Sequence, residues 1–180
     1  MRDQPIGVFD SGMGGLTVMR ALVERLPNES FVYLGDTARL PYGSKSADTV
    51  RRYAVQCASA LMRHRIKLVV VACNTASATA LPGLTDALKP VPVLGVIDPG
   101  AEAAVKAAPS GRIAVIATEG TVSGRAYERA IHARNPAAIV TQQACPLFVA
   151  LAEEGLTNGP IVGLAAKRYL DPLLAGASPE

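Results

Sequence analysis

The feature that most constrains the fold of this chain is a regular alternation of short apolar runs with longer helical patterns. Four runs are apolar almost throughout and predict buried strands at residues 5–10, 30–36, 67–73 and 91–97. Apolar residues at helical spacing predict helices between them, at 14–26, 46–65 and 76–89. Strands separated by helices form parallel βαβ units with helices on both faces of the sheet. The fold class is therefore α/β.

The same rhythm begins again after Asp98-Pro99-Gly100, which breaks the pattern. Helices are expected at 101–108, 122–134 and 160–174, and strands at 112–118 and 138–143. We therefore expect two doubly wound parallel-sheet domains, at 1–98 and 99–180. The alternative is that the segment around Pro99 is a loop within one sheet.

Composition and charge exclude several classes of protein. The net charge of +3 is small, and no aromatic residues are interleaved with the basic ones, so nucleic acid is not an expected partner. The longest apolar run, at 68–73, is too short to span a bilayer. Three widely spaced cysteines predict neither a disulfide framework nor a zinc site. With no signal-peptide pattern at the amino end, we expect a reducing cytoplasm.

Four unusual segments follow expected strands, and ligands of open parallel sheets bind at the carboxyl ends of strands. We therefore expect these segments to collect along one edge. The first is DSGMGGL at 10–16, whose glycines allow a sharp turn and leave free amides at a helix start. Neither nucleotide-binding glycine motif is complete, because Thr17 replaces a required glycine and the phosphate-loop lysine is absent. An ionised Asp10 at a strand end needs a partner; a tight turn capped by Ser11 is the structural alternative.

Two further segments offer hydrogen-bonding groups to a polar ligand. Gly35-Asp36 leads into a turn at 41–44, where Tyr42 and Ser44 carry hydroxyls. An ordinary loop explains this segment equally well. Residues 118–121 (TEGT) place two hydroxyls and several amides beside a helix start, which suits anion binding, and capping of that helix by Thr121 is the alternative.

The remaining segment is Cys73-Asn74-Thr75, at the end of a very apolar strand and before a helix expected near Ala76. A helix amino end lowers the pKa of a thiol, because free amides and the helix dipole stabilise the thiolate. Asn74 and Thr75 can cap the helix or hold a substrate carboxylate. A buried, inert Cys73 is the alternative. Cys57, on a buried helical stripe, and Cys145, among apolar neighbours, are expected to be structural.

Taken together and in this order, these segments resemble glutamate racemases, and the match runs over nearly the whole chain. The matching residues are 10–16, 40–43, 72–76 and 118–121, followed by 144–149 and 153–155. The resemblance implies two α/β domains that face each other across the active site, the second incomplete. It also implies a cytoplasmic isomerase without cofactor or metal, whose substrate is glutamate and whose product D-glutamate supplies peptidoglycan; a homodimer is left open.

In this family, one cysteine thiolate removes the Cα proton and the thiol of a second cysteine returns a proton on the other face. By resemblance, Cys73 takes the proton from D-glutamate, and Asp10 is the carboxylate near it. Asp36 and Glu153 are implied as supporting acids. The residues implied to hold the amino acid are Asp10, Ser11, Tyr42, Gly43, Asn74 and Thr75, with Thr118 and Thr121 contributing from the second domain.

One departure from the family bears on activity. The second cysteine of the family lies in a Gly-Cys-Thr-His motif, and no Cys-Thr-His occurs in these 180 residues. We therefore expect either a truncated chain or a degenerate relative, which racemises glutamate inefficiently. A racemase for aspartate or a hydantoin, and a non-catalytic module that binds an amino acid or a partner protein, are the alternatives.

Overall fold

The structure is a computed structural model that describes residues 3–177. The chain divides into two compact units, Met1–Val96 (unit 1) and Ile97–Glu180 (unit 2). This division falls between Val96 and Ile97, close to the boundary expected after residue 98. Every described strand pairs in parallel and the strands alternate with helices, which confirms the α/β class.

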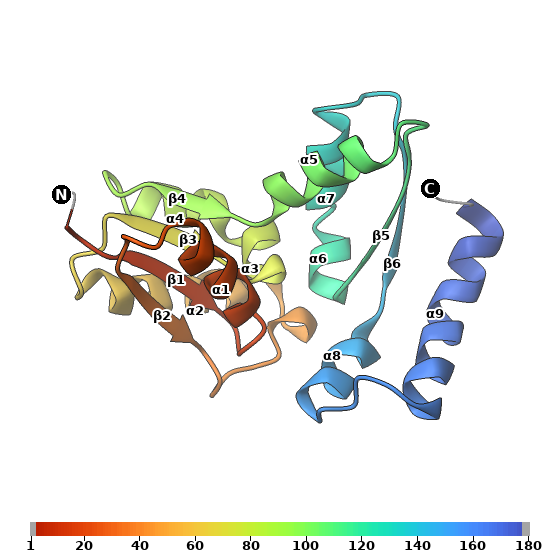
Figure 1. Cartoon of the computed structure of the whole chain (residues 1–180), viewed down its shortest axis with the longest axis horizontal. Helices are drawn as coiled ribbons and strands as arrows, with labels where there is room; N and C mark the ends of the chain where they lie inside the picture. Colours follow the sequence, from red (N-terminus) through yellow and green to blue (C-terminus); the bar gives the residue numbers. More distant parts are fainter. Residues whose placement is uncertain (1–2, 178–180) are drawn as a thin grey trace. The chain divides into compact units, whose positions relative to one another are not determined.

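Unit 1 contains a four-stranded parallel sheet in the order β2-β1-β3-β4 (Figure 1). The strands are β1 (Ile6–Asp10), β2 (Phe31–Gly35), β3 (Leu68–Val71) and β4 (Val93–Gly95), each inside an expected run. In register, Asp10 lies opposite Gly35 and Phe9 lies opposite Val71. The carboxyl ends of the first three strands therefore meet at one edge, which brings together the segments that follow them.

Helices cover both faces of this sheet. On one face, Ile6, Val8, Val70 and Ala72 form a buried cluster against which α1 (Leu16–Arg25) packs. On the other face, Phe9 belongs to a larger core that includes α2 (Ala47–Met62), α3 (Asn74–Thr79) and α4 (Leu81–Ala87). Figure 1 shows α1 and α2 on these opposite faces. Unit 1 is thus doubly wound, as the sequence predicts.

The helix expected at 76–89 is two helices in the structure. α3 starts earlier, at Asn74, and ends before Ala80, and α4 begins with a proline in its first turn. Pro82 has no backbone N–H to donate to the preceding turn, so the helix cannot continue through it. The helix expected at 46–65 ends at Met62, and Ser46 caps it by accepting from the amide of Thr49 at 3.3 Å.

Unit 2 is built on a two-stranded parallel sheet of β5 (Arg112–Ala117) and β6 (Ile139–Ala144). α5 (Ile97–Ala107) and α7 (Ala126–His132) pack on one face, and α9 (Pro160–Ala177) packs against both strands from the other face (Figure 1). α8 (Pro146–Glu153) lies beside α9, where the rings of Phe148 and Tyr169 meet edge to face at 5.4 Å.

Three expectations for the second half of the chain are wrong, and one helix was missed. Asp98-Pro99-Gly100 does not break the pattern but lies inside α5, because the first turn of a helix tolerates proline. The helix expected at 122–134 is divided into α6 (Glu119–Ser123) and α7 by Arg125, whose φ of 47° is left-handed. α8 was not expected. Residues 118–121 follow β5, so they lie at the second sheet and not along the edge shared by the other three segments.

Replacement of Leu84 by Ala tests the larger core of unit 1. Leu84 is fully buried in that core, whereas Leu94 of β4 is 55% exposed. We expect Leu84→Ala to lower the free energy of unfolding by about 2–5 kcal/mol and Leu94→Ala by about 0.5 kcal/mol or less. Urea denaturation followed by circular dichroism measures both. Equal losses for the two variants would contradict the core that is described here.

Candidate functional site

The candidate site of unit 1 starts from a buried carboxylate at the end of β1. Asp10 is 5% exposed, and its Oδ2 accepts hydrogen bonds from the amides of Gly12 at 3.1 Å and Gly15 at 3.0 Å. A buried carboxylate needs such donors because it has lost its water. These two amides are therefore not free for a ligand. α1 begins at Leu16 and has no side-chain cap, so the structural alternative of a turn capped by Ser11 is not what the structure shows.

Two glycines allow the loop after β1 to pack this tightly. A Cβ on Gly15 would lie 2.6 Å from the Cβ of Asp10, and a Cβ on Gly35 would lie 2.3 Å from the carbonyl oxygen of Gly12. Both separations are impossible for a real side chain without a shift of the backbone. The absence of side chains at these positions therefore sets the path of residues 11–15 over the sheet edge.

Cys73 lies between this loop and α3. Its sulfur accepts from the amide of Ala76 at 3.4 Å, so Cys73 itself is the residue that caps α3. Its thiol donates to the hydroxyl of Ser11 at 3.3 Å, across 62 residues of sequence. Asn74 and Thr75 are the first two residues of α3, after its N-cap; the side chain of Asn74 is exposed and that of Thr75 is buried.

Burial governs the protonation of Cys73. The side chain is 6% exposed, and the loss of hydration raises the pKa of its thiol above the ordinary value. The hydrogen bond between Cys73 and Ser11 and the bond from the Ala76 amide lower this pKa, and the nearby charge of Asp10 raises it further. The sequence-based expectation of a lowered pKa is therefore wrong, because desolvation outweighs the single amide that α3 supplies.

A second buried polar cluster joins the segment after β2 to α2. The hydroxyl of Tyr42 donates to Oδ2 of Asp36, and Nε of Arg39 lies 2.7 Å from the same oxygen. Nη2 of Arg39 also donates to the sulfur of Cys57 at 3.4 Å. Asp36, at 8% exposed, and Tyr42, at 1%, thus satisfy each other. Burial and the bond to Asp36 raise the pKa of Tyr42, so this hydroxyl stays protonated.

This cluster engages the side chains of two predicted site residues. The Tyr42 hydroxyl donates its proton to Asp36, so it is not a free donor for a substrate, whereas the backbone of η1 (Tyr42–Ser44) includes Gly43. Asp36 acts in the structure as an acceptor that holds its own segment. Cys57 lies on the buried stripe of α2, as the sequence predicts.

Two of the predicted residues of unit 2, Thr118 and Thr121, lie at the start of α6. The hydroxyl of Thr118 accepts from the amide of Thr121 at 3.4 Å and lies 3.0 Å from the Thr121 hydroxyl, which is fully buried. The cap of this helix is therefore Thr118 and not Thr121. Glu153 is the last residue of α8 and is exposed. Cys145 is 3% exposed and faces the carbonyl oxygen of Gln143 at 3.6 Å, consistent with a structural role.

One residue of the unit 1 site was missed by sequence reasoning. The hydroxyl of Tyr33, in β2, lies 3.0 Å from the carbonyl oxygen of Gly12 and 3.4 Å from Oδ2 of Asp10. Alternation along β2 could have placed Tyr33 on the same face as Val8, its partner in register. No local signal shows that its hydroxyl reaches the end of β1.

The described residues, 3–177, contain no group of three or more His, Cys, Asp or Glu side chains that could hold a metal ion. In the same residues, no helix combines the length and the apolar character that crossing a bilayer requires. The unit 1 site brings a thiol, a hydroxyl and a carboxylate to one sheet edge, and these groups suit proton transfer.

Comparison with known proteins identifies the class to which this site belongs. A sequence profile described as Asp/Glu/Hydantoin racemase matches residues 6–167, so the chain belongs to this racemase family. A glutamate racemase from Geobacter metallireducens is 54% identical over 168 residues, which are 93% of this chain and 62% of the relative. The chain thus spans less than two thirds of the length of that relative.

Solved structures agree with this family. A glutamate racemase from Francisella tularensis in complex with D-glutamate superposes with a TM-score of 0.93 at 41% identity, covering 99% of this chain and 66% of the other. A glutamate racemase from Escherichia coli, in complex with L-glutamate and the activator UDP-MurNAc-ala, gives a TM-score of 0.76 at 32% identity, covering 95% and 64%. The resemblance inferred from the sequence motifs is therefore confirmed.

Replacement of Gly35 by Ala tests the packing of the loop after β1. The added Cβ would meet a backbone oxygen, so we expect a loss of about 1–3 kcal/mol in the free energy of unfolding. The matched control is Gly83→Ala in α4, where a Cβ meets nothing within 4 Å. There, we expect a gain of about 0.4–1 kcal/mol from reduced chain entropy. Urea denaturation measures the free energy of unfolding of both variants. An unchanged free energy of unfolding in Gly35→Ala would contradict the close approach of residue 35 to the Gly12 carbonyl oxygen.

The raised pKa of Cys73 predicts how its reactivity depends on pH. A neutral thiol does not react with iodoacetamide, so the alkylation rate of Cys73 should still be rising beyond pH 9.0, the ordinary pKa of a thiol. Mass spectrometry of the Cys73 peptide after timed alkylation gives the rate at each pH. A short peptide of residues 70–78 is the reference, and its alkylation rate should level off at a lower pH than that of the folded chain. A plateau for the folded chain by about pH 8 would show a stabilised thiolate instead.

Proposed function

We propose that this protein is a glutamate racemase of the cytoplasm, which interconverts L- and D-glutamate without a cofactor and supplies D-glutamate for peptidoglycan. The observation that carries the proposal is the Cys73 sulfur, held between the Ser11 hydroxyl and the Ala76 amide at the carboxyl edge of a parallel sheet. D-Glutamate and L-glutamate are bound in the structures of the Francisella and Escherichia relatives.

Cys73 is the base that we assign to D-glutamate. The Cα proton of an amino acid is a very weak acid, so its removal needs a thiolate and donors that stabilise the carbanion in a dry site. The thiolate forms the new S–H bond, and the electron pair of the broken C–H bond remains on the substrate, delocalised into its carboxylate. A proton that a second thiol then delivers to the opposite face inverts the centre.

The raised pKa of Cys73 is compatible with this role when substrate is bound. The α-ammonium group of glutamate is attached to the reacting carbon, so it must lie close to the Cys73 sulfur during proton transfer. A cation at that distance in a poorly hydrated site lowers the pKa of the thiol. In the proposed mechanism, the ionisation of Cys73 is coupled to the binding of glutamate.

The other residues are assigned by position. Asp10 holds the loop that carries Ser11, and Asn74 and Thr75 adjoin the base in α3. The list of groups proposed to hold the amino acid is Asp10, Ser11, the backbone of Tyr42 and Gly43, Asn74 and Thr75, with Thr118 and Thr121 from unit 2. Asp36 and Glu153 are proposed as supporting acids, Asp36 through the segment that it anchors.

Exchange of the substrate α-proton tests this function in the 180-residue chain, which contains no Cys-Thr-His. In D2O, we expect the Cα proton signal of D-glutamate to disappear much faster than that of L-glutamate, without efficient racemisation. Cys73→Ala should slow this exchange by at least about 100-fold, because the base is removed. Proton NMR of each enantiomer measures exchange, and circular dichroism measures racemisation.

Cys145→Ala is the matched control, since Cys145 is buried like Cys73 but belongs to unit 2. It should keep the exchange rate of the unaltered chain. Binding of glutamate without exchange of either enantiomer would favour a non-catalytic amino-acid-binding protein. Exchange with aspartate or a hydantoin in preference to glutamate would favour the other substrates that the family description names.

A further inference from the structure

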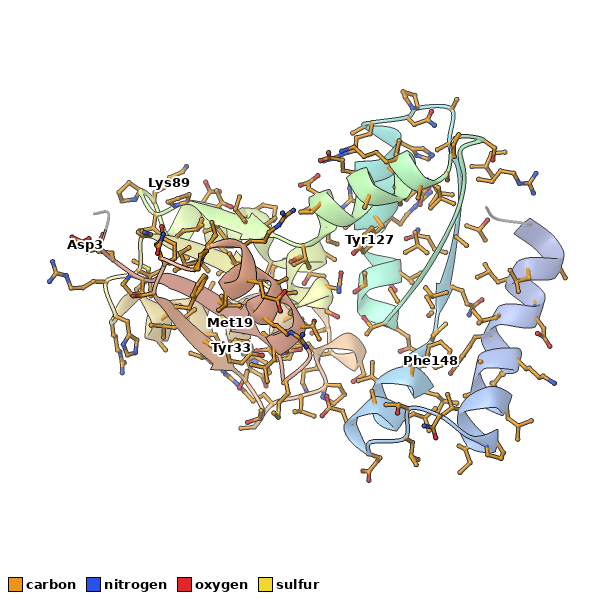
Figure 2. The ribbon with its side chains drawn as sticks, viewed as in Figure 1. Asp3, Met19, Tyr33, Lys89, Tyr127 and Phe148 are labelled. Carbon is orange, nitrogen blue, oxygen red and sulfur yellow. The ribbon has the colours of Figure 1, made fainter. Side chains whose placement is uncertain are left out.

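Tyr33 connects the body of the unit 1 sheet to the loop that carries the proposed catalytic groups. Its ring packs against the buried cluster beneath α1, as does Met19; both are labelled in Figure 2. Its hydroxyl reaches out of β2 to the carbonyl oxygen of Gly12 at 3.0 Å and to Oδ2 of Asp10 at 3.4 Å. One rigid side chain thus touches both the loop and the carboxylate.

The space for this contact is created by Gly35. A Cβ at position 35 would lie 2.3 Å from the carbonyl oxygen of Gly12 and 3.1 Å from Cε1 of Tyr33. The ring edge and the carbonyl therefore meet where a side chain of residue 35 would stand. An aromatic ring has only two side-chain torsions, so an anchored tyrosine fixes its hydroxyl with little loss of entropy.

The contacts continue from Tyr33 to the thiol. Gly12, which accepts from Tyr33, directly follows Ser11, whose hydroxyl accepts from the Cys73 thiol at 3.3 Å. Asp10, the second acceptor of Tyr33, already has the amides of Gly12 and Gly15 as donors. A phenol has one proton to donate, and the shorter of the two contacts is the one with the Gly12 carbonyl oxygen. Asp10 keeps its two amide donors without Tyr33.

We propose that Tyr33 is a positioning residue, whose hydroxyl tethers the Gly12 carbonyl and the Asp10 carboxylate so that Ser11 stays on the Cys73 sulfur. The catalytic consequence rests on the proposed function, whereas the tether itself does not. Burial, followed by the charge of Asp10, raises the pKa of Tyr33 to about 12. The phenol therefore remains a hydrogen-bond donor at working pH and is not a second base.

Tyr33→Phe removes the hydroxyl and keeps the ring, and Tyr53→Phe on α2 is the matched control. In the chain without substrate, we expect the amides of Gly12 and Gly15 to exchange with D2O about fivefold faster in Tyr33→Phe, because a local tether is lost. Amides of the α2 core should be unchanged. Alkylation of Cys73 at a fixed pH should also be about fivefold faster, since the loop covers the sulfur less well.

Unchanged amide exchange and unchanged alkylation in Tyr33→Phe would overturn the inference, and so would an equal acceleration of the α2 core, which indicates general destabilisation. With D-glutamate, the positioning role predicts that kcat for α-proton exchange falls about fivefold or more while KM changes less than about twofold. An unchanged kcat would overturn the catalytic part. If the unaltered chain fails to exchange the α-proton, the proposed function fails. The role of Tyr33 as a tether is then still tested by the amide exchange of Gly12 and Gly15 and by the alkylation rate of Cys73.

Discussion

The burial of the Asp10 carboxylate is the constraint from which the carboxyl edge of unit 1 follows. A charge that is 5% exposed requires donors, and the chain after β1 supplies them by folding the amides of Gly12 and Gly15 back onto it. This close approach excludes a Cβ at Gly15 and at Gly35. The resulting loop carries the Ser11 hydroxyl to a sulfur that lies 62 residues further along the chain.

The same edge explains why a cysteine can be both shielded and chemically useful. Cys73 loses its hydration at the end of β3, and one amide and one hydroxyl do not offset that loss, so the pKa of the thiol is raised. In such a poorly hydrated site, a bound cation interacts strongly with the sulfur. In the proposed mechanism, the thiol ionises when an amino acid binds.

In the cluster of Asp36, Arg39 and Tyr42, a second buried carboxylate is stabilised by hydrogen-bond donors. Here the donors are a phenol and a guanidinium, and they tie the segment after β2 to Cys57 of α2. The first cluster orders the loop beside Cys73, and the second orders the turn that contains Gly43. The proposed substrate contacts of both segments are thus backbone groups and small side chains, supported by larger ones beneath.

The sequence by itself determined the α/β class, the four strands of unit 1 and the place of Asp10 and Cys73 at strand ends, because continuous apolar runs and glycine-rich turns are local signals. It misjudged Pro99, which a first helical turn accommodates, and the helix at 122–134, which Arg125 interrupts. Only the tertiary structure decided that Cys73 is a raised-pKa thiol, that the Tyr42 hydroxyl belongs to Asp36, and that Tyr33 reaches Gly12. Protonation and hydrogen-bond partners depend on burial and on contacts between residues that are distant in the chain. Local sequence patterns do not predict either the burial or these contacts.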